Sequence, residues 1–194
     1  MSKPLFAILR FAKYKGPEIG HIESHNERTK EKYASNPDVD TSRSHLNFHL
    51  VTPQRKYRAE AEKQIAEAGC RTRSDSVRVV EALVTASPEF FKGKKKVEVR
   101  AYFNEALDFM QKHQSKDTII SAVVHMDEKT PHMHLCFVPL TEDGRLSAKA
   151  EKAGLSKILA ARKAAAKPAA EAETVTAPPA EPCTASIPGI EVMD

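Results

Sequence analysis

The sequence predicts an α+β fold with about five β-strands, and three observations support this. Five short segments either alternate between apolar and polar side chains or are rich in apolar and β-branched ones, as strands are. Longer segments between them carry apolar residues at helical spacing. The last two predicted strands are separated by a few residues that include Pro131, which favours a hairpin. The length of 194 residues suits one domain of ordinary size with a tail.

Two strands are expected in the first third of the chain. Residues 3–11, KPLFAILRF, form a short apolar run, and residues 45–52, HLNFHLVT, alternate between apolar and polar side chains. The polar segment between them contains Ser24 followed three residues later by Glu27, the spacing of a capping box. We therefore expect a short helix that begins at Ser24 and ends before Pro37.

The middle of the chain alternates between the two types of element. Residues 56–69 favour helix at nearly every position and end at Gly69, while the β-branched content of residues 76–86 favours a strand. A helical turn capped by Ser87 follows, with Pro88 at its first position. Residues 95–114 carry apolar side chains at helical spacing, which predicts an amphipathic helix.

The last third of the chain divides into a hairpin and two further segments. Residues 117–127 and 132–140 are the predicted hairpin strands. Residues 150–167 are rich in Ala and Lys and are expected to be helical. Residues 168–194 contain five prolines and few large apolar residues, so a disordered tail is expected there.

Charge and cysteine content point to a polyanion-binding protein of a reducing compartment. The tail holds five acidic residues and no Lys or Arg, so residues 1–167 carry 30 basic against 21 acidic residues. A body this basic attracts polyanions, although a solubilising surface remains the alternative. Three scattered cysteines argue against a disulfide framework, and no apolar run approaches the ~20 residues of a membrane span. We therefore expect a cytoplasmic protein without membrane insertion.

The predicted hairpin carries a candidate metal site. His132 and His134 are two positions apart on a strand, so their rings face the same side, and the hairpin brings His125 opposite them. Three imidazoles with open coordination positions suit a catalytic Zn, Mn, Fe or Ni ion. Asp127 or Glu128 would be a fourth ligand, a partner that orients a histidine, or a base. The alternative is a set of strand histidines with ordinary hydrogen bonds.

A metal beside a basic surface suggests phosphate-ester chemistry, which also needs a nucleophile. His25, in ESHNERTK, is a candidate because a neutral imidazole is available near pH 7, whereas a tyrosine must be activated. Arg28, on the same helical face, and Arg43, before the second strand, could hold phosphate. The competing nucleophiles are Tyr14, Tyr33, Tyr57 and Tyr102.

Two stretches together resemble a known family. HNERTKEKYASNPDVDTSRSHLNFHL (25–50) and HMDEKTPHMHLCFVP (125–139) are similar, in order and spacing, to the motifs of MobV-type plasmid mobilisation relaxases, the Pre/Mob plasmid recombination enzymes of the HUH group. The pattern HxDExTPHxH followed by an apolar run and VP is the most specific part. The likeness covers roughly residues 3–149, and residues 1–149 are therefore the predicted relaxase catalytic domain.

The resemblance implies an antiparallel sheet flanked by helices and an enzyme that nicks one DNA strand at an origin of transfer. It places His125, His132 and His134 on the ligands of a Mn²⁺ or Mg²⁺ ion. It places His25 on the nucleophile that becomes joined to the 5′ end of the DNA, and Glu128 on the acid beside the metal. The implied partners are origin DNA, as a hairpin plus a single strand, and a coupling protein of a conjugation system.

The sequence departs from the family after TEDGRLSAK, where relatives continue with helical sequence that completes the DNA-binding domain. Two alternatives follow. The chain would be a truncated module that binds an origin or promoter without turnover, or a replication initiator of the HUH group that uses Tyr33 as nucleophile.

Overall fold

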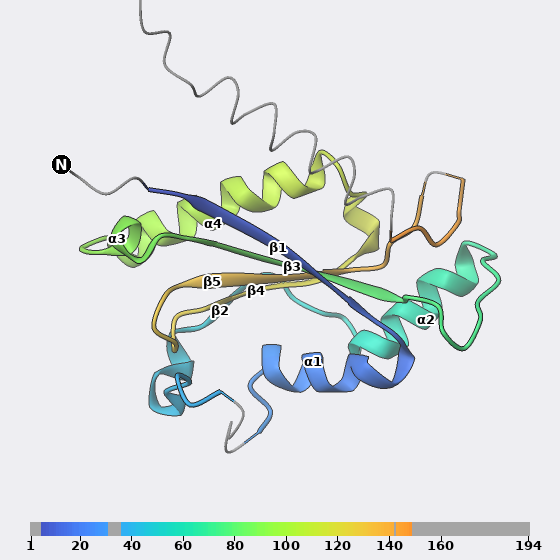
Figure 1. The fold of residues 1–194 in the computed structure, drawn as a ribbon, viewed down its shortest axis with the longest axis horizontal. Helices are drawn as coiled ribbons and strands as arrows, with labels where there is room; N and C mark the ends of the chain where they lie inside the picture. The colour runs from blue at the N-terminus through green and yellow to red at the C-terminus, as the bar shows by residue number, and fades with distance from the viewer. Residues whose placement is uncertain (1–4, 31–35, 142, 149–194) are drawn as a thin grey trace, which may run out of the picture.

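The computed structural model describes residues 5–30, 36–141 and 143–148. Within them, five antiparallel strands form one sheet in the order β1-β3-β5-β4-β2, which confirms the predicted fold class (Figure 1). The strands are β1 (Ala7–Tyr14), β2 (Phe48–Val51), β3 (Val79–Ala86), β4 (Ile119–His125) and β5 (His132–Phe137). The predicted helix at 150–167 and tail at 168–194 lie outside the described residues.

Helices cover both faces of this sheet (Figure 1). On one face α4 (Lys96–Gln111) packs with the short α3 (Pro88–Phe91), and on the other lie α1 (Ile19–Asn26) and α2 (Tyr57–Glu67). None of the helices in the described residues has the length and apolar character needed to cross a membrane.

Local sequence explains how α2 and α4 begin and end. In α4 the buried positions recur at helical spacing, and the Glu98 carboxylate accepts a hydrogen bond from the Lys95 backbone N–H at 2.9 Å. Gly69 follows the end of α2, and its positive φ of 64° lets the Cys70 N–H return to the Ile65 carbonyl. Both helices therefore lie within the predicted ranges.

Two predictions about local structure were wrong. Ser24 does not begin a helix: it lies inside α1, which starts at Ile19, and its hydroxyl donates to the Gly20 carbonyl at 2.8 Å. The strand expected at 45–52 is confined to β2, because Thr41–Leu46 form a 3₁₀ helix capped by Asp40. The first change places His25 in the last turn of α1.

The predicted hairpin is present, and its register decides where the histidines lie. His125 is the last residue of β4 and pairs directly with His132, the first residue of β5. His134 pairs with Val123 and with Leu83 of β3, so it lies near the middle of the sheet. Strand alternation then sends all three rings to one face of the sheet, as the sequence predicts, and the structure shows that α1 and α2 cover this face.

Candidate metal centre and active site

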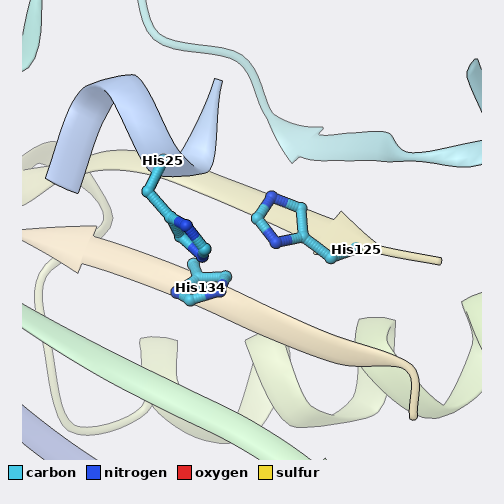
Figure 2. Close-up of side chains that lie close together, drawn as sticks. All are labelled: His25, His125 and His134. Atoms are coloured by element: carbon cyan, nitrogen blue, oxygen red, sulfur yellow. The ribbon is translucent and has the colours of Figure 1, made fainter. Parts of the chain in front are cut away.

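Four imidazole rings meet beneath α1 at the hairpin end of the sheet. Neighbouring rings among His25, His125, His132 and His134 have centroids 4.7 to 5.5 Å apart. Figure 2 shows His25 reaching down from α1 towards His125 on β4 and His134 on β5. The structure thus brings together one histidine from the N-terminal segment and three from the hairpin.

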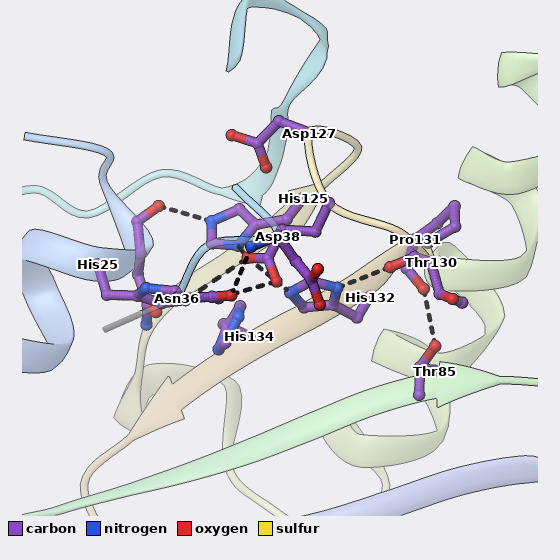
Figure 3. A network of polar contacts seen from close by, with 12 residues as sticks. His25, Asn36, Asp38, Thr85, His125, Asp127, Thr130, Pro131, His132 and His134 are labelled. Atoms are coloured by element: carbon purple, nitrogen blue, oxygen red, sulfur yellow. Dashed lines mark hydrogen bonds and ion pairs between the residues drawn. The ribbon is translucent and has the colours of Figure 1, made fainter. Parts of the chain in front are cut away.

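Each hairpin histidine places one ring nitrogen within hydrogen-bond distance of an oxygen acceptor. Figure 3 shows the contact of His132 with Thr130. A carbonyl or an ionised carboxylate can only accept, so the nitrogen that faces it carries a proton, and in a neutral ring the other nitrogen then has a free lone pair. The three pairs are His125 Nε2 with the Asn26 carbonyl (2.9 Å), His132 Nδ1 with the Thr130 carbonyl (2.8 Å) and His134 Nδ1 with the Glu81 carboxylate (2.8 Å).

The lone pairs left over are those a divalent cation needs. His125 Nδ1 and His134 Nε2 are buried and have no hydrogen-bond partner among the described residues, which is costly for a polar atom in a protein interior. Burial lowers the pKa of His125 to about 4, so this ring is neutral at neutral pH. Ligand atoms of His125, Glu128 and His132 lie within 4.8 Å of one another, as do those of His25, His125 and His134. The residues therefore fit a metal ion bound by nitrogen and carboxylate oxygen.

Glu128 is the carboxylate at the centre of this group. Its Oε1 atom lies 3.8 Å from His25 Nε2, 3.8 Å from His125 Nδ1 and 3.6 Å from His132 Nε2. Burial acts to raise the pKa of Glu128, but its contacts with His125 and His132 outweigh burial and hold the pKa well below its usual range. An ionised carboxylate among four imidazoles matches the charge that a cation site requires.

His25 is the most accessible of the four rings, with 30% of its side chain exposed. Burial, followed by the nearby His134 and Arg28, lowers the pKa of His25 to about 4. Its ring is therefore neutral near pH 7 and lies at the open side of the cluster, where a substrate can reach it.

Known proteins share the sequence that builds this site. The family model for plasmid recombination enzymes, Mob_Pre, matches residues 3–173. The chain belongs to this family.

Relatives and solved structures agree with the assignment. A plasmid recombination enzyme of Bacillus thuringiensis is 41% identical over 146 residues, which cover 74% of this chain and 33% of the relative. A type 1 plasmid recombination enzyme of Staphylococcus aureus is 40% identical over 148 residues, covering 74% of this chain and 36% of the relative. The chain spans about a third of the length of these curated relatives.

The structural match is to the MobM relaxase domain bound to plasmid pMV158 oriT DNA, in a Mn-bound crystal structure. It has a TM-score of 0.71 and 31% identity, and covers 79% of this chain and 81% of that domain. The expected membership of the Mob_Pre family and the expected fold are both confirmed.

Arg28 connects α1, the helix that carries His25, to the β4–β5 hairpin of this Mob_Pre domain. It follows α1 with a positive φ of 52°, and the Arg28 and Thr29 N–H groups return to the His25 and Ser24 carbonyls. This is a Schellman ending, which usually places glycine where Arg28 stands. A side chain in this conformation costs on the order of 1 kcal/mol, so an interaction of Arg28 must offset the cost.

The guanidinium of Arg28 makes that interaction with two carboxylates. It donates to both oxygens of Asp127, at 2.8 and 2.9 Å, and to Glu128 Oε1 at 2.6 Å, with only 8% of the side chain exposed. Arg43 is exposed and donates to the Met126 carbonyl at 2.8 Å. Phosphate binding by Arg28 and Arg43 stays a prediction.

Asp127 is not oriented as a metal ligand. Its carboxylate is fully buried and lies apart from the imidazole rings, bound by Arg28, Ser44 and Asn47 (Figure 3). Its backbone carbonyl also accepts the Asp40 N–H at 2.9 Å. Of the two acidic residues considered from the sequence, Asp127 ties the segment before β2 to the hairpin, and Glu128 faces the histidines.

Sequence reasoning missed Glu81 and Asn26, which support the cluster from behind. Glu81 accepts hydrogen bonds from Tyr14, Asn26 and His134 at 2.9, 3.1 and 2.8 Å. Asn26 also supplies the carbonyl that holds His125. A signal for Glu81 existed, since it is the one charged residue in the apolar strand VVEALVTA. Asn26 gave no comparable signal, because it lies in a polar segment.

The tyrosines considered as nucleophiles are engaged elsewhere or lie outside the described residues. Tyr14 donates to Glu81, Tyr57 to Glu27 and Tyr102 to the Thr85 carbonyl. Burial raises the pKa of all three hydroxyls, which disfavours the phenolate. Tyr33 lies outside the described residues.

Proposed function

We propose that this chain is the catalytic part of a metal-dependent DNA relaxase that nicks one strand at an origin of transfer, for plasmid mobilisation or recombination. The observation that carries the proposal is the convergence of four imidazoles and one carboxylate, with the free nitrogens of the hairpin histidines facing inwards. Membership of the plasmid recombination enzyme family supports DNA as the substrate.

In this proposal the hairpin histidines hold Mn²⁺ or Mg²⁺. The Mn-bound MobM relaxase domain, which is 31% identical, supports this choice of ion. Such an ion supplies electrostatic stabilisation to the scissile phosphate. Glu128 contributes negative charge to the cation site and contacts His25, and Arg28 keeps Glu128 in place.

The reaction we propose is a transesterification at phosphorus. The neutral ring nitrogen of His25 attacks the phosphorus, a nitrogen–phosphorus bond forms, and the bond to the 3′ oxygen breaks. The 3′ oxygen leaves and takes a proton from water, and the hydroxide that forms takes the remaining N–H proton of the His25 ring. The 5′ phosphate stays joined to His25 through the nitrogen–phosphorus bond. Arg43, exposed beside the hairpin, contacts the DNA backbone. We also propose a cytoplasmic location, where plasmid DNA is found.

The test is adduct formation with Mn²⁺ and supercoiled plasmids that carry candidate origins, including the pMV158 oriT bound by MobM. We expect a covalent protein–DNA adduct that His25→Ala abolishes. His21→Ala is the matched control, because His21 is an exposed histidine one turn earlier in α1. Mass spectrometry should find the nucleotide on His25; an adduct that survives His25→Ala would show that another residue is the nucleophile.

A non-catalytic DNA-binding module is the alternative outcome of this test. Sequence-specific binding of an origin without an adduct in Mn²⁺ or Mg²⁺ would identify it. A replication initiator would instead lose its adduct on Tyr33→Phe.

A further inference from the structure

The hairpin that carries the histidines borders a cavity on its other face. This cavity has a volume of about 480 Å³ and lies between α3, the start of α4 and the β4–β5 turn. Apolar side chains form much of its lining, among them Phe91, Val99, Met126 and Pro131. Met126 packs on the α4 side of the sheet, whereas the neighbouring His125 points to the α1 side. The cavity and the metal centre therefore share one hairpin.

Positive charge surrounds the opening of the cavity. Lys92, Lys94 and Lys129 line it, against one acidic residue, Glu89. The Lys94 amine lies 4.9 Å from the Phe90 ring centroid and 3.7 Å from Glu98. Lys92 and Lys129 are exposed and form no ion pair with any described residue, so their charges are available to a ligand.

The cavity wall is fixed relative to the metal centre. The Thr130 carbonyl holds the His132 ring, and the Pro131 carbonyl accepts the Thr85 hydroxyl at 2.7 Å (Figure 3). Lys129 directly follows Glu128 and is exposed at the turn, between the two faces. A single DNA strand that ran from the metal centre around this turn would therefore meet Lys129 first and then the cavity.

We propose that this cavity binds one unpaired nucleotide of the DNA strand that passes the metal centre, with the base on the apolar lining and the flanking phosphates on the lysines. The inference rests on the proposed relaxase function and adds a subsite to it. Single-stranded DNA is recognised by such a combination of a positively charged surface and apolar or aromatic contacts to the bases. The volume falls within the range of about 300–1,000 Å³ typical of small-ligand sites.

A nucleotide explains both chemical properties of the cavity better than an acidic peptide does. Each nucleotide pairs one charged phosphate with one flat aromatic base, whose faces stack on apolar surface, and this matches lysines around an apolar lining. A peptide rich in Asp and Glu would satisfy the lysines and leave Met126 and Pro131 without an apolar partner.

The first experiment measures binding of a fluorescent oligothymidylate to Lys92→Gln/Lys94→Gln/Lys129→Gln as a function of salt. The matched control is Lys13→Gln/Lys112→Gln/Lys116→Gln, which removes the same charge from exposed lysines near the other end of the sheet. Each phosphate contact to a single strand contributes about 0.7 to the salt slope, so loss of the two flanking phosphate contacts should lower the slope by about 1.4 and raise the Kd on the order of tenfold. We expect the control to change the Kd much less.

The second experiment locates the base. Oligothymidylate with one 5-iododeoxyuridine, irradiated in complex with the wild-type protein, should crosslink to Phe91 or Met126. Equal losses in the two triple variants, or crosslinks only to other regions, would overturn the proposal. So would a labelled oligoglutamate that binds wild type more tightly than oligothymidylate and is lost in the cavity variant, because the occupant would then be an acidic protein segment.

These measurements need neither a divalent metal nor His25. Failure of the proposed nicking activity can therefore be told apart from failure of the cavity assignment. If only the nicking proposal fails, no adduct forms, but the cavity variant still loses affinity for single-stranded DNA. If nicking occurs and the two triple variants bind DNA equally, only the cavity assignment fails.

Discussion

The two faces of the sheet are built from the same strands and differ in what they bury. Under α4 the buried side chains of the core are apolar, from Val80 and Val84 on β3 to Met133 and Leu135 on β5. Under α1 and α2 the apolar core is interrupted by buried polar residues. They are Asn26, Glu81, Ser121, His125 and His134.

This difference separates stability from chemistry within one sheet. Apolar burial stabilises the fold in proportion to the area removed from water. Buried polar groups cost free energy unless they are paired, and within the described part of the chain His125 Nδ1 and His134 Nε2 have no hydrogen-bond partner. The face under α1 therefore keeps an unfavourable arrangement that a bound cation would relieve, and the face under α4 provides the stability that tolerates it.

The largest effect on stability should come from a substitution on the face under α4, here called the apolar face; the face under α1 and α2 is called the polar face. Phe103 is fully buried and its ring stacks on Phe91 at 5.8 Å between centroids. Phe103→Ala should lower the free energy of unfolding by about 3–5 kcal/mol, measured by urea denaturation, because it leaves a cavity in the core. Val97→Ala, at a position of the same helix that is 78% exposed, should change it by less than about 0.5 kcal/mol.

The same variant tests whether the two faces are independent. Under conditions where Phe103→Ala is folded, its Mn²⁺ affinity should equal that of the wild type. A large loss of Mn²⁺ affinity in the folded variant would show that the α4 face also positions the metal ligands.

The next largest effect should come from the buried ion pair at the edge of the polar face. Asp127→Ala removes both hydrogen bonds that the Arg28 guanidinium, which is 8% exposed, makes to Asp127. We expect a loss of about 3 kcal/mol in the free energy of unfolding, since a buried charge loses one of its carboxylate partners and Ser44 and Asn47 lose their acceptor. Asp143→Ala removes a carboxylate that is 72% exposed and should have almost no effect. Equal effects of the two substitutions would contradict a structural role for Asp127.

The apolar face and the hairpin could be predicted because their signals are local. Helix α4 and the β4–β5 hairpin follow from periodicity and turn residues within short windows. Strand order is not local: β1 pairs with β3, with Ala7 opposite Ala86, and nothing in either segment specifies the other. The helix start at Ser24 was mispredicted because a capping-box spacing occurs by chance inside α1, where Ser24 bonds back to Gly20.

The candidate site divides in the same way. His125, Glu128, His132 and His134 were predicted because they lie within ten residues, and one hairpin register places their side chains together. The preference for His25 came from the family resemblance, since nothing local links it to residues a hundred positions later. The supports Glu81 and Asn26 could not be predicted, because their roles depend on the packing of α1 against β3 and β5.

A third prediction concerns how the polar face prepares its ligands. Glu81→Gln replaces the ionised acceptor of the His134 ring by a neutral amide, which weakens control over the orientation of His134. We expect Mn²⁺ affinity, measured by electron paramagnetic resonance titration, to fall about 10–100-fold, as for comparable partners of metal-bound histidines. Tyr14→Phe removes only a donor to the other Glu81 oxygen and should have a smaller effect. A larger loss in Tyr14→Phe would show that the network acts through β1 and not through His134.

The smallest predicted effect compares alanine substitutions at two glycines. It tests whether the glycine inside α1 lowers the stability of the protein. Gly20 lies inside α1, and Gly69 follows α2 with a φ of 64°. At both positions no atom of the described residues outside the local backbone lies within 4 Å of the place that a Cβ would occupy, so crowding does not decide the outcome. Gly20→Ala should raise the free energy of unfolding by about 0.5–1 kcal/mol, because alanine restricts the unfolded chain and favours helix. Gly69→Ala should lower it by about 1 kcal/mol, because the left-handed conformation is strained for a side chain.

Urea denaturation measures both glycine variants against the wild type. A destabilising Gly20→Ala would show that α1 needs a flexible residue one turn before His25. The face under α1 would then be less stable because of the α1 backbone as well as the buried ring nitrogens of His125 and His134. The contrast with the face under α4 would then include the covering helix as well as the side chains of the sheet.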